Sequence, residues 1–325
     1  MVTRPLVSDA PIWGPADLSQ PELVGLAGHC RFPSGRTVDV AVSGGPDSLA
    51  LVVLARVAGL EVTAHHIDHG LRKGSADEAG RVGRTVSSLG ASFISRRIEV
   101  DPGPNIEARA RADRYRALPA GVLTGHTADD QAETVLLNVL RGAALDGLAP
   151  MTGAGRVRRP LLGLRRSDTQ HVCALANVVP LHDPSNDDLR FRRNAVRHRV
   201  LPLLAEVAQR DPVPVLARQA LLLADDAALL NQLAAELDPT DARALADAPA
   251  PLARRAVRTW LRVSSDAEHH PPSQAEVERI LTVARGAAVA TEVAGGRRVR
   301  RSHGRLTLER PVGGGDANEP VGPDE

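Results

Sequence analysis

Lysine, cysteine and aromatic residues are scarce in this 325-residue sequence, which has a single lysine, Lys73, beside two cysteines, two tryptophans, one tyrosine and three phenylalanines. The cysteines, Cys30 and Cys173, form no CxxC pair, so neither a disulfide framework nor a cysteine-based metal site is supported. Because a Walker phosphate loop needs a lysine after its glycine, the absence of GxxxxGK[ST] excludes the P-loop NTPases.

Long apolar runs are also missing, and the first 20 residues are rich in proline and interrupted by acids. No stretch of 18 or more apolar residues exists to span a bilayer, and no cationic segment leads into an apolar one. We therefore expect a cytoplasmic protein that makes no membrane contact.

The order of apolar patterns predicts the fold class. Strand patterns are found at 38–42, 61–67, 91–100 and 121–125, and helical patterns at 46–58, 75–89, 105–118 and 129–141. Alternation of this kind favours an α/β fold with a doubly wound parallel sheet, in which ligands bind at the carboxyl ends of the strands.

The pattern changes after residue 150 and suggests a second, smaller and mostly helical domain. The predicted divisions are an N-terminal segment 1–36, a catalytic domain 37–208, a mostly helical domain 212–311 and a tail 312–325. The tail is rich in glycine, proline and acids, a composition typical of disorder. No coiled-coil pattern sets the oligomeric state, and a homodimer is compatible with the sequence.

A short polar loop joins the first strand to the first helix of the catalytic domain, in the stretch VDVAVSGGPDSLALVVLA. The loop consists of Ser43, Gly44, Gly45, Pro46, Asp47 and Ser48. Its glycines free the backbone amides, the helix start attracts anions, and proline suits a first helical turn. An acid beside a phosphate requires a magnesium ion between them or a cationic substrate. The presence of Asp47 in the loop therefore predicts either the ion or such a substrate.

A second acidic group follows the fourth strand, in GHTADDQAET at 125–134. Asp129, Asp130 and Glu133 belong to the first turn of a helix, where acids also serve as simple caps. Together with Asp47, these acids can bind Mg²⁺, for which we select Asp47 and Asp130, and can attract the cationic groups of a substrate.

Two further motifs have competing interpretations. HHIDHGLR at 65–72 contains three histidines, but its spacing lacks the helical HExxH geometry of a zinc site. NIEARARADRY at 105–115 places Glu107, Arg111 and Arg114 along one helical face, where a surface ion-pair ladder is the alternative to a role in the site.

The loop SGGPDS resembles the SGGxDS pyrophosphate loop of the N-type ATP pyrophosphatases, which adenylate a substrate and release pyrophosphate. The later motifs RRPLLGLRR (158–166), DPSN (183–186) and RRNAVRHRVLPLL (192–204) follow in the same order as in tRNA(Ile)-lysidine synthetases. The resemblance to that family covers roughly residues 38–205.

The resemblance implies an ATP-dependent ligase that joins L-lysine to carbon 2 of the wobble cytidine in the isoleucine tRNA with a CAU anticodon. The reaction passes through an adenylated tRNA, releases AMP and pyrophosphate, and changes the codon and amino-acid identity from Met to Ile. The implied ATP-binding residues are the loop 43–48 with His66, Asp68 and His126. The implied catalytic residues are Asp47, Asp129, Asp130, Glu133 and Arg111. The implied tRNA contacts are Arg114, Arg159, Asp183, Asn186, Arg193, Asn194 and Arg197.

Three alternatives remain open. A tRNA thiolase uses the same adenylation but typically needs paired cysteines. GMP and NAD synthetases are similar only at the loop, and the arginine-rich segments have no purpose in them. A non-catalytic module that binds adenine nucleotides would share the loop without turnover. The chain is also shorter than the longest family members, so we expect residues 212–311 to contact the tRNA body.

Overall fold

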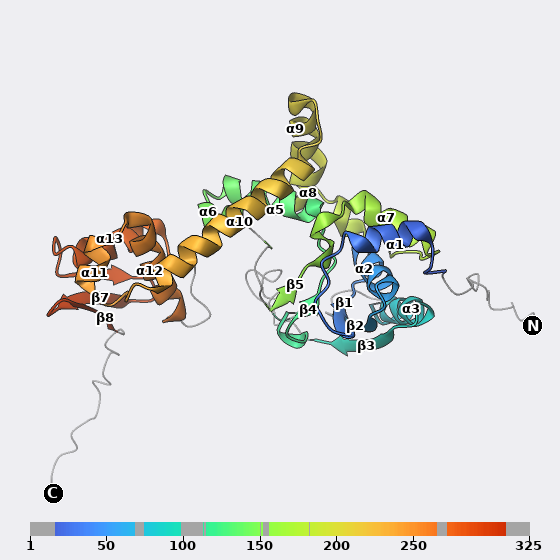
Figure 1. Ribbon diagram of the computed structural model, residues 1–325, viewed down its shortest axis with the longest axis horizontal. Coiled ribbons are helices and arrows are strands. Elements are labelled where there is room, and N and C mark those ends of the chain that lie inside the picture. The colour runs from blue at the N-terminus through green and yellow to red at the C-terminus, as the bar shows by residue number, and fades with distance from the viewer. Residues whose placement is uncertain are drawn as a thin grey trace, which may run out of the picture. The chain divides into compact units, whose positions relative to one another are not determined.

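The computed structural model describes residues 17–68, 75–98, 113, 115–149, 151, 156–181, 183–264 and 272–309 (Figure 1). The chain forms two compact units, Met1–Ala224 and Asp225–Glu325. This division falls inside one helix, α10 (Val213–Ala235), and the domain limits drawn from the sequence stay a prediction.

The first unit is built on a five-stranded sheet in the order β3-β2-β1-β4-β5, with every pair parallel. Its strands are β1 (Thr37–Ala41), β2 (Glu61–Asp68), β3 (Ser92–Arg97), β4 (Val122–Leu123) and β5 (Val157–Arg158). The chain runs outward from β1 to β3 and then returns to the other side of β1. The strand order therefore reverses between β1 and β4, which is where ligands bind in open parallel sheets.

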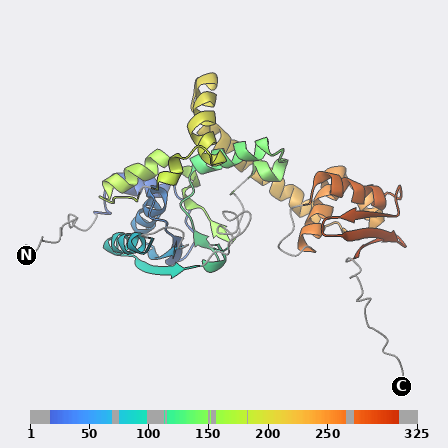
Figure 2. The ribbon, with the colours of Figure 1, turned by 180° about the vertical axis from the view of Figure 1, so that it is seen from behind.

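The central helix α2 (Pro46–Val57) is buried on all sides because residues Leu49 to Ala55 are all apolar. Helices α1 (Pro21–Gly28) and α7 (Arg166–Leu175) pack beside it, as Figures 1 and 2 show. Helix α3 (Ser75–Ser88) packs on β2 and β3. The main core of the unit lies between these helices and the sheet.

The remaining elements of the first unit follow β4. They are α5 (Ala128–Leu140), α6 (Leu145–Leu148), η1 (Pro160–Gly163), η2 (Pro184–Asp187), α8 (Arg192–Ala195), the π-helical turn η3 (Val196–Val200) and α9 (Leu201–Ala208). A small apolar cluster joins α5 to η3 and to the start of α10. This cluster brings the basic segment after residue 191 against the acidic start of α5.

The second unit has its own core. Helices α11 (Ala242–Asp247), α12 (Ala250–Val263) and α13 (Gln274–Ala284) share it with an antiparallel sheet of β6 (Ala290–Val293), β7 (Arg297–Ser302) and β8 (Arg305–Glu309). Among the described residues, no helix is both long enough and apolar enough to cross a membrane.

The fold class predicted from the sequence is confirmed. The α/β alternation forms a doubly wound parallel sheet, and the region after residue 212 is mostly helical. The strand predicted at 91–100 is seen at 92–97, and the one at 121–125 is only two residues long. Most of the helix predicted at 105–118 lies outside the described residues.

Candidate active site

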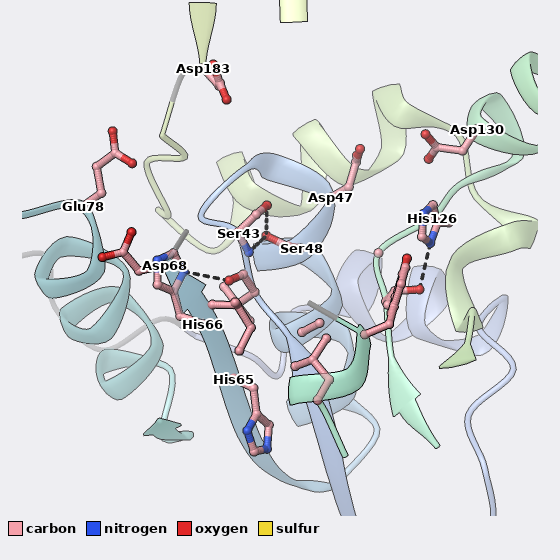
Figure 3. A pocket seen from close by; sticks show the side chains of 17 residues that line it. Ser43, Asp47, Ser48, His65, His66, Asp68, Glu78, His126, Asp130 and Asp183 are labelled. Atoms are coloured by element: carbon pink, nitrogen blue, oxygen red, sulfur yellow. Dashed lines mark hydrogen bonds between the residues drawn. The ribbon is translucent and has the colours of Figure 1, made fainter. Parts of the chain in front are cut away.

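A cavity of about 430 Å³ opens at the carboxyl ends of β1, β2 and β4, where the strand order reverses (Figure 3). Its lining consists of Ala41, Val42, Ser43, Asp47, Ser48, His65, His66, Ile67, Asp68, Glu78, Tyr115, Leu118, Thr124, Gly125, His126, Asp130 and Asp183. The place of the cavity is the one that the parallel fold favours for a ligand.

The loop 43–48 is preorganised by hydrogen bonds within itself. The Ser48 hydroxyl donates to the Gly45 carbonyl at 2.9 Å and accepts from the Ser43 amide at 3.2 Å. Pro46 occupies the first turn of α2, with Gly45 as the residue before the helix. The loop and the start of a buried helix thus lie together beside the cavity, an arrangement that favours phosphate.

Position 44 accepts only glycine, because the loop leaves no room for a side chain there. Its φ is +88°, and a Cβ there would lie 2.8 Å from side-chain atoms of both Val82 and Leu181. The Leu181 amide also donates to the Gly44 carbonyl at 2.8 Å. A segment far along the chain therefore fixes the curvature of the loop.

The turn after β4 packs against the same loop. A Cβ on Gly125 would lie 2.5 Å from the backbone oxygen of Asp47, so only glycine permits this approach. Next to it, His126 Nδ1 lies 2.8 Å from the Thr124 hydroxyl. The close approach places His126 on the cavity wall beside the loop, as Figure 3 shows.

Residues at the end of β2 form the opposite wall. His66 is buried, and its Nδ1 lies 2.9 Å from the Val42 carbonyl, which can only accept, so this nitrogen carries the hydrogen. Asp68 and Asp183 also line the cavity. His65 has a structural role, because its ring points away from the loop and pairs with Asp39 at 2.6 Å.

Two carboxylates of the predicted catalytic group, Asp47 and Asp130, line the cavity on the same side. Burial raises the pKa of Asp47, although the Thr169 hydroxyl donates to it and Arg166 lies 3.7 Å away. Asp130 caps α5 by accepting from the Thr127 amide at 2.9 Å. Burial opposes ionisation of Asp130 too, but Arg193, Arg166 and His126 together lower its pKa.

Glu133 is completely buried and lies behind these acids, outside the cavity lining. Arg197 and Arg193 each donate to it at 2.7 Å, and Arg166 at 3.2 Å. Arg193 and Arg166 also contact Asp130, at 3.0 and 3.3 Å. The carboxylates of Asp47, Asp130 and Glu133 are thus matched in formal charge by three guanidinium groups.

Asp129 is not part of the cavity lining. The Arg165 side chain donates to both of its oxygens, at 3.0 and 3.1 Å, and the Arg166 amide donates at 2.8 Å. Burial opposes ionisation, but these hydrogen bonds outweigh it and lower the pKa of Asp129. The residue therefore ties the start of α5 to the start of α7.

The structure places the predicted tRNA contacts in different surroundings. Arg159 donates to the Met151 carbonyl at 3.4 Å, and Asn194 is buried and donates to the Asp188 carbonyl at 2.9 Å. Asn186 is exposed in η2. Arg111 and Arg114 lie outside the described residues. Each of these assignments stays a prediction.

The sequence argument missed Arg165, Arg166 and Thr169. All three lie where α7 begins and contact acids 33 to 122 positions away in the chain. The only signal was their place in or beside RRPLLGLRR, a motif from which we assigned Arg159 alone to the tRNA.

The acids of the cavity fit a magnesium ion shared with phosphate better than a metal held by protein alone. Within the described ranges, no group of three or more His, Cys, Asp or Glu side chains is placed to hold a metal ion. Mg²⁺ commonly uses one or two carboxylates together with substrate phosphates and water. Asp47 and Asp130, which line one cavity beside a phosphate loop, match that requirement.

Solved structures support the fold. The U34-tRNA thiolase NcsA from Methanococcus maripaludis superposes with a TM-score of 0.52 over 63% of this chain and 78% of that protein, at 14% identity. At this identity, the likeness establishes a shared fold.

Two family models match the sequence. The PP-loop domain matches residues 24–204, and the TilS substrate binding domain matches residues 241–307. The first match covers more than half of the chain and contains every described element that lines the cavity.

Relatives match over most of their own length. The tRNA(Ile)-lysidine synthase of Nocardia farcinica is 42% identical over 295 residues, which are 84% of this chain and 92% of that protein. The synthase of Corynebacterium glutamicum is 39% identical, with coverages of 85% and 88%, and that of Thermobifida fusca is 38% identical, with coverages of 85% and 93%. With its PP-loop and TilS domains and relatives of this identity, the chain belongs to the tRNA(Ile)-lysidine synthase family.

Proposed function

We propose that the protein ligates free L-lysine to carbon 2 of the wobble cytidine in the CAU-anticodon isoleucine tRNA, with cleavage of ATP to AMP and pyrophosphate. The observation that carries the proposal is one cavity that combines a phosphate loop with the carboxylates of Asp47 and Asp130. We infer the reaction from membership of the family, and we infer its location from the cavity.

ATP binds with its polyphosphate in the loop 43–48 and its adenosine toward the end of β2. The loop offers amides and a helix start, whereas His66 and Asp68 offer ring and carboxylate acceptors at the opposite wall. Adenylation of the cytidine oxygen turns a poor leaving group into AMP, which the lysine amine then displaces. The loop amides stabilise the charge that develops on the departing pyrophosphate.

The acidic lining of the cavity supports the binding of ATP together with a cation. Among the described residues, the cavity is lined by five carboxylates, of Asp47, Asp68, Glu78, Asp130 and Asp183, and by no lysine or arginine. Acids on the wall disfavour a bare triphosphate and favour one that carries a cation. Asp47 and Asp130 would hold Mg²⁺, which neutralises phosphate charge when bound, and the remaining acids attract the ammonium groups of lysine.

We assign the tRNA contacts to residues of both units. In the second unit, the exposed Arg298 and Arg300 alternate with the buried Val299 along β7, so both side chains leave the same face of the sheet. Guanidinium groups on an exposed strand suit phosphate contacts, which fix position on an RNA. A cytoplasmic location and a homodimer stay predictions from the sequence.

A coupled assay tests the proposal. Purified protein is incubated with magnesium-ATP and a CAU-anticodon isoleucine tRNA transcript, with and without lysine; pyrophosphate is measured, and the nucleosides are analysed by mass. We expect lysidine at the wobble position, lost in Asp47→Ala and kept in Glu22→Gln. The second variant is a matched control, because Glu22 is an exposed acid that pairs with His171.

Other outcomes separate the alternatives. ATP binding without pyrophosphate release in the presence of tRNA and lysine would indicate a nucleotide-binding module. Pyrophosphate release without incorporation of lysine would indicate another tRNA substrate or a thiolase. Either result would refute the proposed function.

A further inference from the structure

The two cavity acids, Asp47 and Asp130, come from different elements and do not hold each other in place. Asp47 follows the loop at the start of α2, and Asp130 lies on the first turn of α5. Both are carboxylates on one wall, so they repel when ionised. Asp130 is held by its own helix cap and by Arg193 at 3.0 Å, but a link between the two acids needs a third element.

That element is the first turn of α7. Thr169 is completely buried, and its hydroxyl donates to Asp47 Oδ1. The same hydroxyl lies 2.8 Å from the Arg166 carbonyl, so it has a helical backbone acceptor as an alternative partner. A carboxylate is the stronger acceptor, and the contact to Asp47 orients one oxygen away from the cavity.

Arg166 contacts both acids from behind the cavity wall. Its Nη2 lies 3.3 Å from Asp130 Oδ1 and its Nε 3.7 Å from Asp47 Oδ2, while Nη1 is anchored on the buried Glu133 at 3.2 Å. Each acid thus meets a different nitrogen of one planar guanidinium group. Because this group is rigid and planar, it fixes the distance between the two carboxylates and also balances their charge.

The turn is itself firmly attached. The Asp129 carboxylate accepts from the Arg166 amide, and the Cys173 thiol donates to the Pro46 carbonyl at 3.4 Å. Helix α7 also packs along the buried α2. The turn is therefore hydrogen-bonded both to α5 and to the loop.

We propose that Thr169 and Arg166 are positioning residues for the reaction: they hold the carboxylates of Asp47 and Asp130 on the cavity wall at the orientation that the cation bound with ATP requires. The inference rests on the proposed function, because it assigns these residues to the same site. Neither residue is among the described lining of the cavity, so both act through the acids.

The first test uses Thr169→Val, which keeps the volume and removes the hydroxyl, and Thr169→Ser, which keeps the hydroxyl. The control is Thr85→Val in α3, where the hydroxyl donates to the Arg81 carbonyl at 3.2 Å. Calorimetry measures ATP affinity with and without magnesium chloride, and the lysidine assay gives kcat and KM. Thermal melting checks that each variant folds.

Thr169→Val is expected to lose most of the gain in ATP affinity that magnesium gives, and to lower kcat about tenfold, a usual penalty for a lost hydrogen bond to a charged group. Its affinity for ATP without magnesium should stay within about twofold, because the loop amides are unchanged. Thr169→Ser should restore both quantities, and Thr85→Val should behave as the unmodified protein. Arg166→Lys, which keeps the charge but loses the fork, should lower kcat to a similar degree.

Two results would overturn the inference. One is a Thr169→Val protein with the magnesium gain and kcat of the unmodified protein. The other is a Thr169→Ser protein as impaired as Thr169→Val, which would mean that packing alone matters. If the unmodified protein binds magnesium-ATP but forms no lysidine, the proposed function fails, and the calorimetry still decides on Thr169.

Discussion

The contact between Gly125 and the phosphate loop makes a specific demand on the sequence. In Gly125→Ala, the new Cβ would lie 2.5 Å from the Asp47 oxygen, 2.6 Å from its carbonyl carbon and 2.9 Å from the Ser48 nitrogen. All three atoms belong to the backbone of the loop and α2, so no side chain can rotate to relieve the overlap. The backbone itself has to move.

The size of the movement follows from ordinary contact distances. Carbon contacts begin at 3.4 Å, so the closest atom must retreat by 3.4 − 2.5, or about 0.9 Å. Overpacking of this kind costs about 1–3 kcal/mol of stability. A displacement near 1 Å in a positioned site costs up to about 10²-fold in rate. We therefore expect Gly125→Ala to lower kcat/KM for ATP by about 10- to 100-fold.

The assay compares pyrophosphate release and urea unfolding of Gly125→Ala with those of Gly25→Ala. Gly25 is an exposed position inside α1, and a Cβ there would meet nothing within 4 Å. The control should keep full activity and gain about 0.5–1 kcal/mol, because alanine favours a helix interior. Full activity and unchanged stability of Gly125→Ala would refute the argument that this approach shapes the loop.

Four further outcomes are expected. Gly44→Ala should abolish ATP binding in calorimetry, because its φ of +88° and its crowded Cβ position exclude a side chain; retained binding would contradict this. Glu133→Gln should lower the free energy of unfolding in urea by about 3–5 kcal/mol, because it removes the buried negative charge that three partly buried arginines share, and an unchanged midpoint would disprove it. The pKa of Asp129 is lowered from 3.8 by folding, so its stabilising effect is complete above that pH and disappears as the pH falls through the lower, folded value. The stability gap between the unmodified protein and Asp129→Asn should therefore shrink below pH 3.8, whereas a gap that stays constant would exclude this linkage. Arg300→Ala should weaken tRNA binding and reduce its salt dependence by about one unit of slope, whereas Arg298→Ala should do so less, because Arg298 lies between two acids across the sheet; equal effects would argue against phosphate contact by this face.

Local signals in the sequence were sufficient for the loop and for the helix that follows it. Pro46 after two glycines indicates a helix start independently of distant residues. The alternation of apolar and polar residues around Val40 and Ala64 indicates the two strands, which pair in parallel. The position of the cavity then follows from the strand order. These features depend on neighbours only a few residues apart.

Contacts between distant segments could not be derived in this way. Asp129 and Glu133 have the spacing of catalytic acids, yet their arginine partners lie 33 to 64 positions away. No residue pattern identifies which arginine approaches which acid. The close approach of Gly125 to Asp47 is equally invisible, because a glycine before a histidine also fits an ordinary turn.

The curvature of the phosphate loop depends on Leu181, which holds Gly44 from a point 137 positions further along the chain. During synthesis on the ribosome, the loop and its strand leave the exit tunnel long before this partner exists. The nascent chain should therefore remain unable to hold ATP until residue 181 has emerged, so formation of the nucleotide site is a late event in the folding of the first unit.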